Sequence, residues 1–250
     1  MELDVYRKVY NLYKQGYWFF KGRNRIIHNV LNRIYSSSSK RPVILDIGCS
    51  SGIIVKDLLF EGFNVFGVDN EDKALECCLD LGLNSRVIKA DIYNLPFSGR
   101  SFDCVTAFDV IEHLDDLASL RQIKRVLKPD GVVLLICPAY NWLWSEKDST
   151  YHHKRRYSSS GLKGVLEKSG FRVEKCSYFN FFLFPVFVLA VLSDKYLSVF
   201  NSKLDFLKPV PSFLNLIFTK LMFLEAFLIE RYRLPFGSSI ICLAKSKDSA

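Results

Sequence analysis

Short apolar runs alternate with segments of helical periodicity along most of this chain. Runs rich in β-branched residues and bounded by glycine, aspartate or proline are typical of strands, and apolar residues three or four positions apart are typical of helices. Strands are expected to alternate with helices as far as about Cys137, which predicts an α/β fold with a parallel sheet covered on both faces. The expected helices are Glu2–Gln15, Gly22–Tyr35, Ile53–Phe60 and Leu162–Ser169, and the expected strands begin at Val43 or cover Phe63–Asp69, Phe171–Tyr178 and Ser238–Ala244.

The segment Phe179–Arg233 interrupts this alternation before the last expected strand. Its roughly 55 residues far exceed an ordinary connection of ~2–6 residues. It contains the apolar run Phe181–Leu192 and the helix-like stretch Ser212–Glu230. The uncharged stretch Cys176–Ser193 reaches the ~18-residue lower limit for a helix that crosses a bilayer. A contact with a membrane surface, a membrane span and a helix of the core all remain open for the insertion.

The polar linker Ser36–Lys40 and this insertion divide the chain into four parts. They are an N-terminal helical part at residues 1–40, a core at 41–178, the insertion at 179–233, and the last strand with its tail at 234–250. The chain has 250 residues, of which 49% are hydrophobic, so it is long enough to bury a substantial core.

The net charge of +8 comes entirely from the C-terminal part of the chain. Residues 1–150 carry 19 Lys or Arg and 19 Asp or Glu, whereas residues 151–250 carry 15 against 7. The same C-terminal residues are rich in phenylalanine. This combination predicts a partner that is anionic and partly apolar.

The seven cysteines are scattered, and no two of them form a Cys-x-x-Cys pair. This pattern indicates reduced, mostly buried thiols and argues against a disulfide framework or a zinc site. Charged residues interrupt the segment Met1–Asn32, so a secretory signal is not expected. We therefore expect a cytoplasmic protein, with any lipid contact at the inner face of the membrane.

The most informative segment is the loop after the first strand, which reads Asp46-x-Gly48-x-x-x-Gly52 and leads directly into a helix. This order places bare backbone and a helix N-terminus where an adenosine-bearing ligand can lie. Asp69 ends the next strand, and an acid ~20 residues after the first is what hydrogen-bonds a ribose diol in dinucleotide folds. Neither Gly-x-Gly-x-x-Gly nor a P-loop is present, so a nucleoside site of another kind is predicted.

This loop resembles motif I of the class I S-adenosylmethionine (SAM) dependent methyltransferases, and the resemblance covers about residues 40–140. The later segment Asn141–Glu146 with Tyr151–Tyr157 looks like the corresponding segment of a bacterial, type 11/12-like subgroup. The family implies a doubly wound, mostly parallel, seven-stranded Rossmann-like sheet, with SAM as cofactor and S-adenosylhomocysteine as product. Further segments carry the resemblance in the family's order: Val68-Asp69, Ala90–Ile92 with Leu95–Phe97, Phe102–Val105 with Glu112–Leu114, and Val126–Gly131 before Val132–Cys137.

The resemblance assigns the cofactor to residues at the ends of several strands. It also suggests that Trp18 and Arg23 fold over the cofactor as part of an N-terminal lid. Ser50 stands where many relatives have glycine, which leaves a non-catalytic scaffold as one alternative. The other expected cofactor residues are Asp46, Gly48, Cys49, Gly52, Asp69, Asn70, Asp91, Ile92, Asp109 and Val110.

Three histidines are the candidates for catalysis: His113, His152 and His153. A base is needed only if the accepting atom is protonated at neutral pH, as a sugar or phenol hydroxyl is, and histidine can take such a proton. The sequence Asp109-x-x-Glu112-His113 also resembles the motif with which ubiquinone-pathway O-methyltransferases bind a divalent ion, although there the first acid is Glu. No metal is predicted, because related methyltransferases carry similar residues without one.

A loop beyond the fifth strand supplies the candidate substrate residues. Its arginines could clamp a phosphate or carboxylate through their bidentate forks, although charged loops are often only solvated. Aromatic residues alternate with basic ones here, but no RNA-binding motif is present and the core is neutral, so we expect no nucleic-acid partner. The candidates are Tyr140, Trp144, Tyr151, Arg155, Arg156 and Tyr157.

Together these features predict in-line methyl transfer to an oxygen of a lipid-linked, glycan or other amphiphilic acceptor. The first alternative is a soluble small-molecule O- or N-methyltransferase in which the insertion forms a dimer interface or a substrate lid. The sequence leaves the oligomeric state open.

Overall fold

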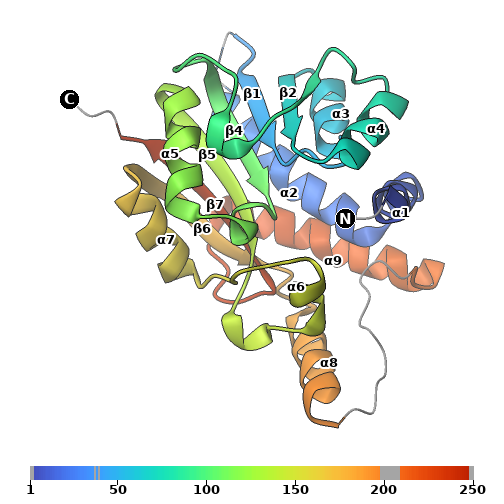
Figure 1. The fold of residues 1–250 in the computed structure, drawn as a ribbon. Coiled ribbons are helices and arrows are strands. Elements are labelled where there is room, and N and C mark those ends of the chain that lie inside the picture. Colours follow the sequence, from blue (N-terminus) through green and yellow to red (C-terminus); the bar gives the residue numbers. More distant parts are fainter. Residues whose placement is uncertain (1–2, 37, 39, 198–208, 248–250) are drawn as a thin grey trace.

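A seven-stranded sheet forms the centre of the protein in a computed structural model that describes residues 3–36, 38, 40–197 and 209–247. Its strand order is β3-β2-β1-β4-β5-β7-β6 (Figure 1). The predicted α/β fold with a doubly wound, mostly parallel sheet is therefore confirmed. The strands are β1 Val43–Ile47, β2 Asn64–Asp69, β3 Val87–Lys89, β4 Phe102–Phe108, β5 Leu127–Pro138, β6 Phe171–Phe179 and β7 Ser239–Ser246.

All neighbouring strands are parallel except β7, which is antiparallel to both β5 and β6. The strand order reverses between β1 and β4, because the chain winds outward from β1 in both directions. In open α/β sheets, ligands bind beyond the carboxyl ends of the strands at such a switch point. In the β1–β4 register, Asp46 lies opposite Thr106, and this pair enters the site described below.

Helices cover both faces of the sheet, and successive residues of one strand serve opposite faces. The helices on one face are α2 Trp18–Tyr35, α3 Ile53–Phe60, α4 Asp72–Asp80 and α9 Ser212–Arg231, and those on the other are α5 Asp116–Val126 and α7 Ser159–Lys168. Ile44 packs on the face that α2, α3, α4 and α9 cover, whereas the next residue, Leu45, packs on the opposite face, which α5 and α7 cover.

The remaining helices lie at the ends of the sheet or outside the two layers. Helix α1, Leu3–Lys14, packs against α4, and α8 projects from the lower end of the molecule next to α6 (Figure 1). The loop beyond the fifth strand, at residues 138–160, contains two short helical segments, η3 and α6. The bounds are α6 Glu146–Thr150, α8 Phe184–Leu197, and the 3-10 turns η1 Ile92–Asn94, η2 Ile111–His113 and η3 Asn141–Leu143.

The two helices α2 and α9, far apart in sequence, lie side by side (Figure 1). Gly22 permits this close approach, since a Cβ at that position would overlap the side chain of Met222. At the start of α2, the backbone N–H of Trp18 donates to Asn215 Oδ1 at 2.8 Å, and the indole packs edge-on against Phe218. One side of α9 therefore belongs to the core, although α9 lies in the insertion.

The observed bounds differ from the expected ones mainly at helix ends. Helix α2 begins at Trp18 instead of Gly22, and α7 begins at Ser159, where Ser158 caps it by accepting from Gly161 N–H at 3.1 Å. The stretch Cys176–Ser193 is divided between β6, a turn and α8, so it is not one helix. By length and composition alone, α9 is the one helix of the described residues that could cross a membrane.

Candidate functional site

The loop between β1 and α3 turns tightly because three of its residues have left-handed backbone conformations. Gly48, Ser50 and Gly52 have φ values of 66, 52 and 73°. A Cβ at Gly48 would lie 2.5 Å from a methyl group of Val110, so glycine is required there for space as well as conformation. Ser50 takes the same conformation although it has a side chain, and a glycine at this position would adopt it with less strain.

Asp69, at the end of β2, holds this loop in place. Its carboxylate accepts the backbone N–H of Ser50 at 2.8 Å and that of Glu71 at 3.0 Å. Each carboxylate oxygen keeps acceptor capacity after one such bond, so both remain able to accept ligand hydroxyls. Burial raises the pKa of Asp69, although the backbone N–H donors oppose that shift. The next residue, Asn70, is exposed.

Asp46 lies beneath the loop and is almost fully buried. It accepts a hydrogen bond from Thr106 Oγ1 at 2.6 Å, across the β1–β4 pair. Burial raises the pKa of Asp46 to about 7, while Thr106 and the nearby Arg23 oppose the shift. Thr106 was not among the predicted residues; a hydroxyl in the buried part of β4, opposite Asp46, is the signal that could have identified it.

Cys49 and Gly52, two residues predicted to bind the cofactor, pack this loop against β2 and α4. Cys49 is buried, and its backbone N–H donates to Val68 O at 3.0 Å, which joins the loop to β2. A Cβ at Gly67 would lie 2.9 Å from the Cys49 side chain, so the two positions fit closely. A Cβ at Gly52 would meet Leu83 and Cys78.

Asp91 and Ile92, which the sequence predicts near the adenine, lie just beyond the end of β3. Asp91 is exposed and caps the turn η1 by accepting the N–H of Tyr93 at 2.9 Å. Ile92 is buried. The Tyr93 hydroxyl in turn accepts the N–H of Asp115 at 2.7 Å, which ties this loop to the start of α5.

Arg23 reaches the carboxyl end of β4 from α2. Its Nη1 lies 2.6 Å from Asp109 Oδ2, and its guanidinium lies over the ring of Phe108. Trp18, expected to share a lid with Arg23, instead anchors α2 against α9 and is buried. The structure therefore brings Arg23 to the strand ends but places Trp18 in the packing between helices.

Tyr6, which sequence reasoning missed, lies where α1 packs on α4, against Ala74 and Cys77. Burial and the nearby Asp69 carboxylate raise the pKa of the Tyr6 hydroxyl. Nothing in the sequence pairs α1 with the end of β2, because this contact depends on how the N-terminal helices pack. Tyr13 of α1 and Asn24 of α2 both donate to Asp57 of α3, which fixes these helices to the core.

Two of the three predicted histidines meet beyond the end of β4. The rings of His113 and His153 are 4.7 Å apart in an edge-to-face arrangement. Burial and the neighbouring His153 lower the pKa of His113, so its neutral form is favoured. His152 is exposed and contributes its main-chain carbonyl, which lies 3.4 Å from His113 Nδ1. His152 therefore joins the other two through its backbone, and its side chain is exposed.

A buried carboxylate, Asp148, orients His153. The distance from His153 Nδ1 to Asp148 Oδ1 is 2.8 Å, and Arg156 approaches both oxygens of Asp148 at 2.7 and 2.8 Å. Ser145 donates to the same carboxylate through its backbone N–H and its hydroxyl. Burial alone would raise the pKa of Asp148, but the bonds from His153 and Arg156 outweigh it and hold the pKa well below its usual range.

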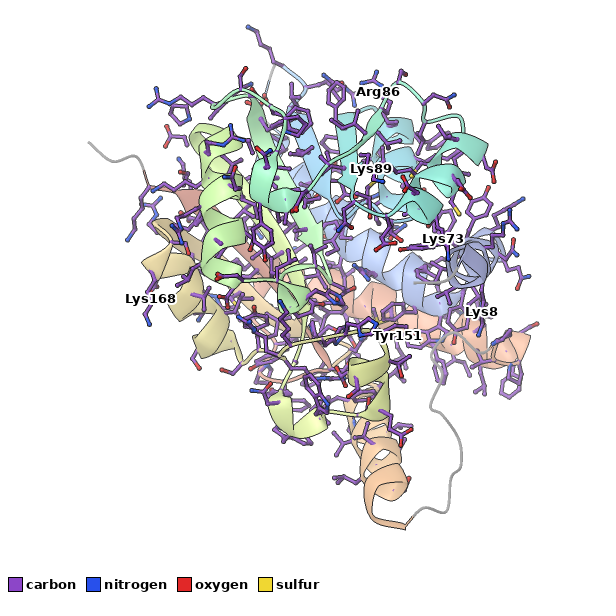
Figure 2. The ribbon with its side chains drawn as sticks, viewed as in Figure 1. Lys8, Lys73, Arg86, Lys89, Tyr151 and Lys168 are labelled. Carbon is purple, nitrogen blue, oxygen red and sulfur yellow. The ribbon has the colours of Figure 1, made fainter. Side chains whose placement is uncertain are left out.

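The predicted substrate residues have partners within the protein. Arg156 is held by Asp148, Arg155 lies 2.8 Å from Asp116, and the Tyr157 hydroxyl donates to Asp116 at 3.2 Å. Tyr151 lies near the centre of the view in Figure 2, on the loop after α6, with its ring 6.2 Å from His153. Of the arginines in this loop, neither is a free clamp for an anion.

Aromatic rings extend from this loop toward α8. Tyr140 stacks on Tyr178 at 5.0 Å, and Trp142 and Phe184 lie 5.6 and 5.8 Å from Tyr140. Phe236 continues the series 5.5 Å from Phe184. Trp144, also predicted from the sequence, is partly buried, and its backbone N–H donates to Asn141 O at 3.1 Å.

Glu112 is fully buried, and neither carboxylate oxygen has a hydrogen-bond partner among the described residues. Burial and the nearby Asp109 raise its pKa well above the usual range. One ligand atom each from Glu112, His113 and His153 lie within 4.8 Å of one another. Such a donor set can hold a divalent ion in part, but Asp109, the first residue of the metal-like motif, is paired with Arg23.

Known proteins that this chain resembles in sequence and in fold include methyltransferases. Residues 45–135 match the family described as "Methyltransferase domain". The chain is 26% identical over 205 residues to a ubiquinone biosynthesis O-methyltransferase of Rickettsia bellii, a match that covers 70% of this chain and 82% of that protein.

Solved structures share the fold at low identity. A SAM-dependent methyltransferase of Archaeoglobus fulgidus superposes with a TM-score of 0.54 at 21% identity, covering 89% of this chain and 94% of that one. Phosphoethanolamine N-methyltransferase 2 of Haemonchus contortus, in complex with S-adenosyl-L-methionine, gives 0.55 at 20% identity, covering 88% and 52%. The strand ends that gather Asp46, Asp69 and Asp109 thus belong to a fold that these methyltransferases share.

Proposed function

Because this chain is a class I SAM-dependent methyltransferase, we propose that it methylates a hydroxyl oxygen of a lipid-linked, glycan or other amphiphilic acceptor, with His153 as the general base. The single observation that carries this proposal is the pairing of His153 with the buried carboxylate of Asp148, beside His113. SAM, the cofactor, supplies an electrophilic methyl group when bound.

The residues at the strand ends fit SAM in their chemistry. Asp69 presents a buried carboxylate with unused acceptor capacity, as a ribose diol requires. Asp46 and the backbone of the loop at Gly48–Gly52 lie beside it, and Arg23 balances the acids from α2. In this proposal Asp69 holds the ribose, Asp91 and Ile92 border the adenine, and the loop supports the amino-acid part of the cofactor.

The proposed base works through its orientation. With Nδ1–H donating to Asp148, His153 leaves Nε2 as an acceptor for the proton of a hydroxyl. Asp148 then stabilises the imidazolium as it forms, and Arg156 keeps Asp148 ionised. His113, whose neutral form is favoured, lies against His153 and is the second candidate for the same role. Methyl transfer requires above all that the acceptor oxygen lie in line with the methyl group. In this proposal these residues therefore position the acceptor hydroxyl as well as deprotonate it.

The aromatic series Tyr140, Trp142, Tyr178, Phe184 and Phe236 supports an acceptor with an apolar part. Trp142 is 49% exposed although it packs on other rings, so its surface is open to a ligand. Aromatic faces of this size contribute much of the energy of apolar contacts. The alternative, a soluble small-molecule acceptor, would not need this extended surface.

The proposed location is the cytoplasm. All seven cysteines are free and buried, which suits a reducing compartment. This location also gives the enzyme direct access to its cofactor.

Methyl-labelled SAM incubated with fractionated lipid and glycan extracts, followed by mass analysis of the labelled product, tests the acceptor class. We expect His153→Gln to lower kcat by about 10²- to 10⁴-fold with SAM affinity unchanged. His28→Gln, a histidine on α2 paired with Glu61, is the matched control and should retain activity. Label that enters only small polar products would refute an amphiphilic acceptor.

The apolar part of the acceptor is tested separately with Trp142→Ala. This variant should raise KM for acceptors with long hydrocarbon chains and leave kcat unchanged, because the ring contacts Tyr140 and Phe184 and takes no part in the reaction. An equal effect on acceptors that lack the chain would contradict the assigned contact.

A further inference from the structure

Helix α9 has an outer face that is almost entirely apolar and open to solvent. Its exposed residues recur three or four positions apart, so they lie on one side of the helix. Their side chains are between 38 and 64% exposed. This α9 face consists of Phe213, Leu216, Ile217, Phe223, Leu224 and Phe227.

The opposite side of α9 is tied to the protein, which excludes a spanning orientation in this fold. Met222 packs over Gly22 of α2, and Asn215 accepts the backbone N–H of Trp18. Glu225 is fully buried and accepts the N–H of Phe182 at 3.0 Å. If α9 crossed a bilayer, these contacts would be broken and Glu225 would face hydrocarbon, where an unpaired acid is costly in free energy.

Basic residues surround the α9 face. The guanidinium of Arg25 lies 5.2 Å from the ring centroid of Phe223, and that of Arg231 lies 5.0 Å from Phe227. Lys220 is exposed within the same side of the helix. An apolar stripe with arginines beside it and one lysine within it is complementary to an anionic bilayer, whose headgroups meet the cations while its acyl boundary accepts the stripe.

We propose that the α9 face docks on an anionic lipid bilayer, with α9 parallel to the membrane surface and its inner side still packed on α2. The aromatic and aliphatic side chains enter the acyl boundary, and Arg25, Lys220 and Arg231 contact lipid phosphates. This docking does not depend on which acceptor the enzyme methylates. It explains why a helix apolar enough to cross a membrane is only 22% buried in the fold.

Vesicle flotation of the full chain tests this proposal. The protein should float with vesicles of phosphatidylcholine and phosphatidylglycerol at low salt, and much less with phosphatidylcholine alone or at high salt. The double variant Ile217→Ser with Leu224→Ser should bind at least about tenfold more weakly, because two aliphatic side chains that would be buried in the bilayer are lost. The matched control, Phe60→Ser with Leu79→Ser, alters exposed apolar residues on α3 and α4 and should float like the parent.

The charge contribution is measured with Lys220→Gln and Arg231→Gln together. Each cation near an anionic surface contributes about fivefold in affinity, so this pair should bind roughly 25-fold more weakly. Equal flotation of the parent and the α9 variants would overturn the proposal. A dimer of the parent that forms with rising protein concentration would also overturn the proposal, if the Ile217→Ser and Leu224→Ser pair dissociates it without weakening vesicle binding. The α9 face would then contact a second copy of the chain.

Three further measurements separate this proposal from the proposed reaction. SAM affinity and thermal stability should match the parent in every α9 variant, because the substituted residues are exposed. Methyl transfer to a detergent-dispersed acceptor should also be unchanged. If the α9 variants lose flotation but still methylate the dispersed acceptor, the result supports membrane docking separately from the reaction. If the parent floats but methylates no acceptor, the proposed reaction is refuted and the docking proposal is unaffected.

Discussion

Replacing Asp148 by Asn tests the proposed base through its partner. The substitution keeps the shape of the side chain and removes the charge that faces His153 at 2.8 Å. Opposite unit charges about 4 Å apart attract by about 4 kcal/mol at an effective dielectric constant of about 20, and Arg156 offsets part of this. We therefore expect kcat to fall by about 10²- to 10³-fold, with KM for SAM unchanged.

The same variant should change stability in a way that depends on pH. Asp148 has a depressed pKa in the folded protein, so its contribution to folding is present above its ordinary pKa of 3.8 and is lost as the pH falls below that value. Thermal unfolding of parent and Asp148→Asn should therefore differ near neutral pH and converge in acid. Chemical denaturation at matched pH values gives the same comparison as a free energy of unfolding.

Ser145→Ala is the control for damage to the loop. It removes the hydroxyl that donates to Asp148 at 3.0 Å and leaves the charge and the backbone donor in place. We expect kcat within about tenfold of the parent, since a hydrogen bond to a charged acceptor contributes about 1.5–3 kcal/mol and the bond from His153 to Asp148, on which the reaction depends, is kept. The reasoning is refuted if Asp148→Asn retains kcat within the same range, or if both variants lose activity equally.

Two more predictions concern the cofactor loop and the helix contact. Asp69→Asn should weaken SAM binding by about 10²- to 10⁴-fold in titration calorimetry, because hydrogen bonds to a charged acceptor contribute about 1.5–3 kcal/mol each. Asp72→Asn, an exposed acid paired with Lys89, should bind like the parent. Gly22→Ala should lower the free energy of unfolding by about 1–2 kcal/mol through overlap with the helix it packs on. Gly164→Ala in α7, where a Cβ meets nothing within 4 Å, should instead stabilise by up to about 1 kcal/mol, and a loss there would count against the packing argument.

The sheet was predictable because its strands carry their own signals. The run from Val43 is apolar, β-branched and ended by Asp46, and β2 repeats that pattern up to Asp69. Such local signals are enough to place both acids at one edge. Strand β3, Val87–Lys89, is too short to show any periodicity, and its existence follows only from pairing with β2.

The insertion shows where pattern alone does not decide. Apolar residues occur all round α9, and such a helix can be core, surface or membrane-bound. Only the packing on α2, through Gly22 and Met222, shows which side is inside. The loop at 138–160 is a similar case, because Asp148 and Arg156 are eight residues apart in a segment without periodicity.

Four residues other than glycine have left-handed backbones just after strand ends, and local sequence does not predict these conformations. Ser50, Asp109, Tyr140 and Asn180 come after β1, β4, β5 and β6, and all have φ between 52 and 60°. Such conformations cost of order 1–3 kcal/mol each in residues other than glycine, so ordinary propensities argue against them. Each turns the chain sharply at the edge where ligands bind; Asp109 is thereby aimed at Arg23. The hydrophobic pattern therefore identifies the edge of the sheet that carries the site, whereas the side chains that meet there depend on conformations that the local sequence disfavours.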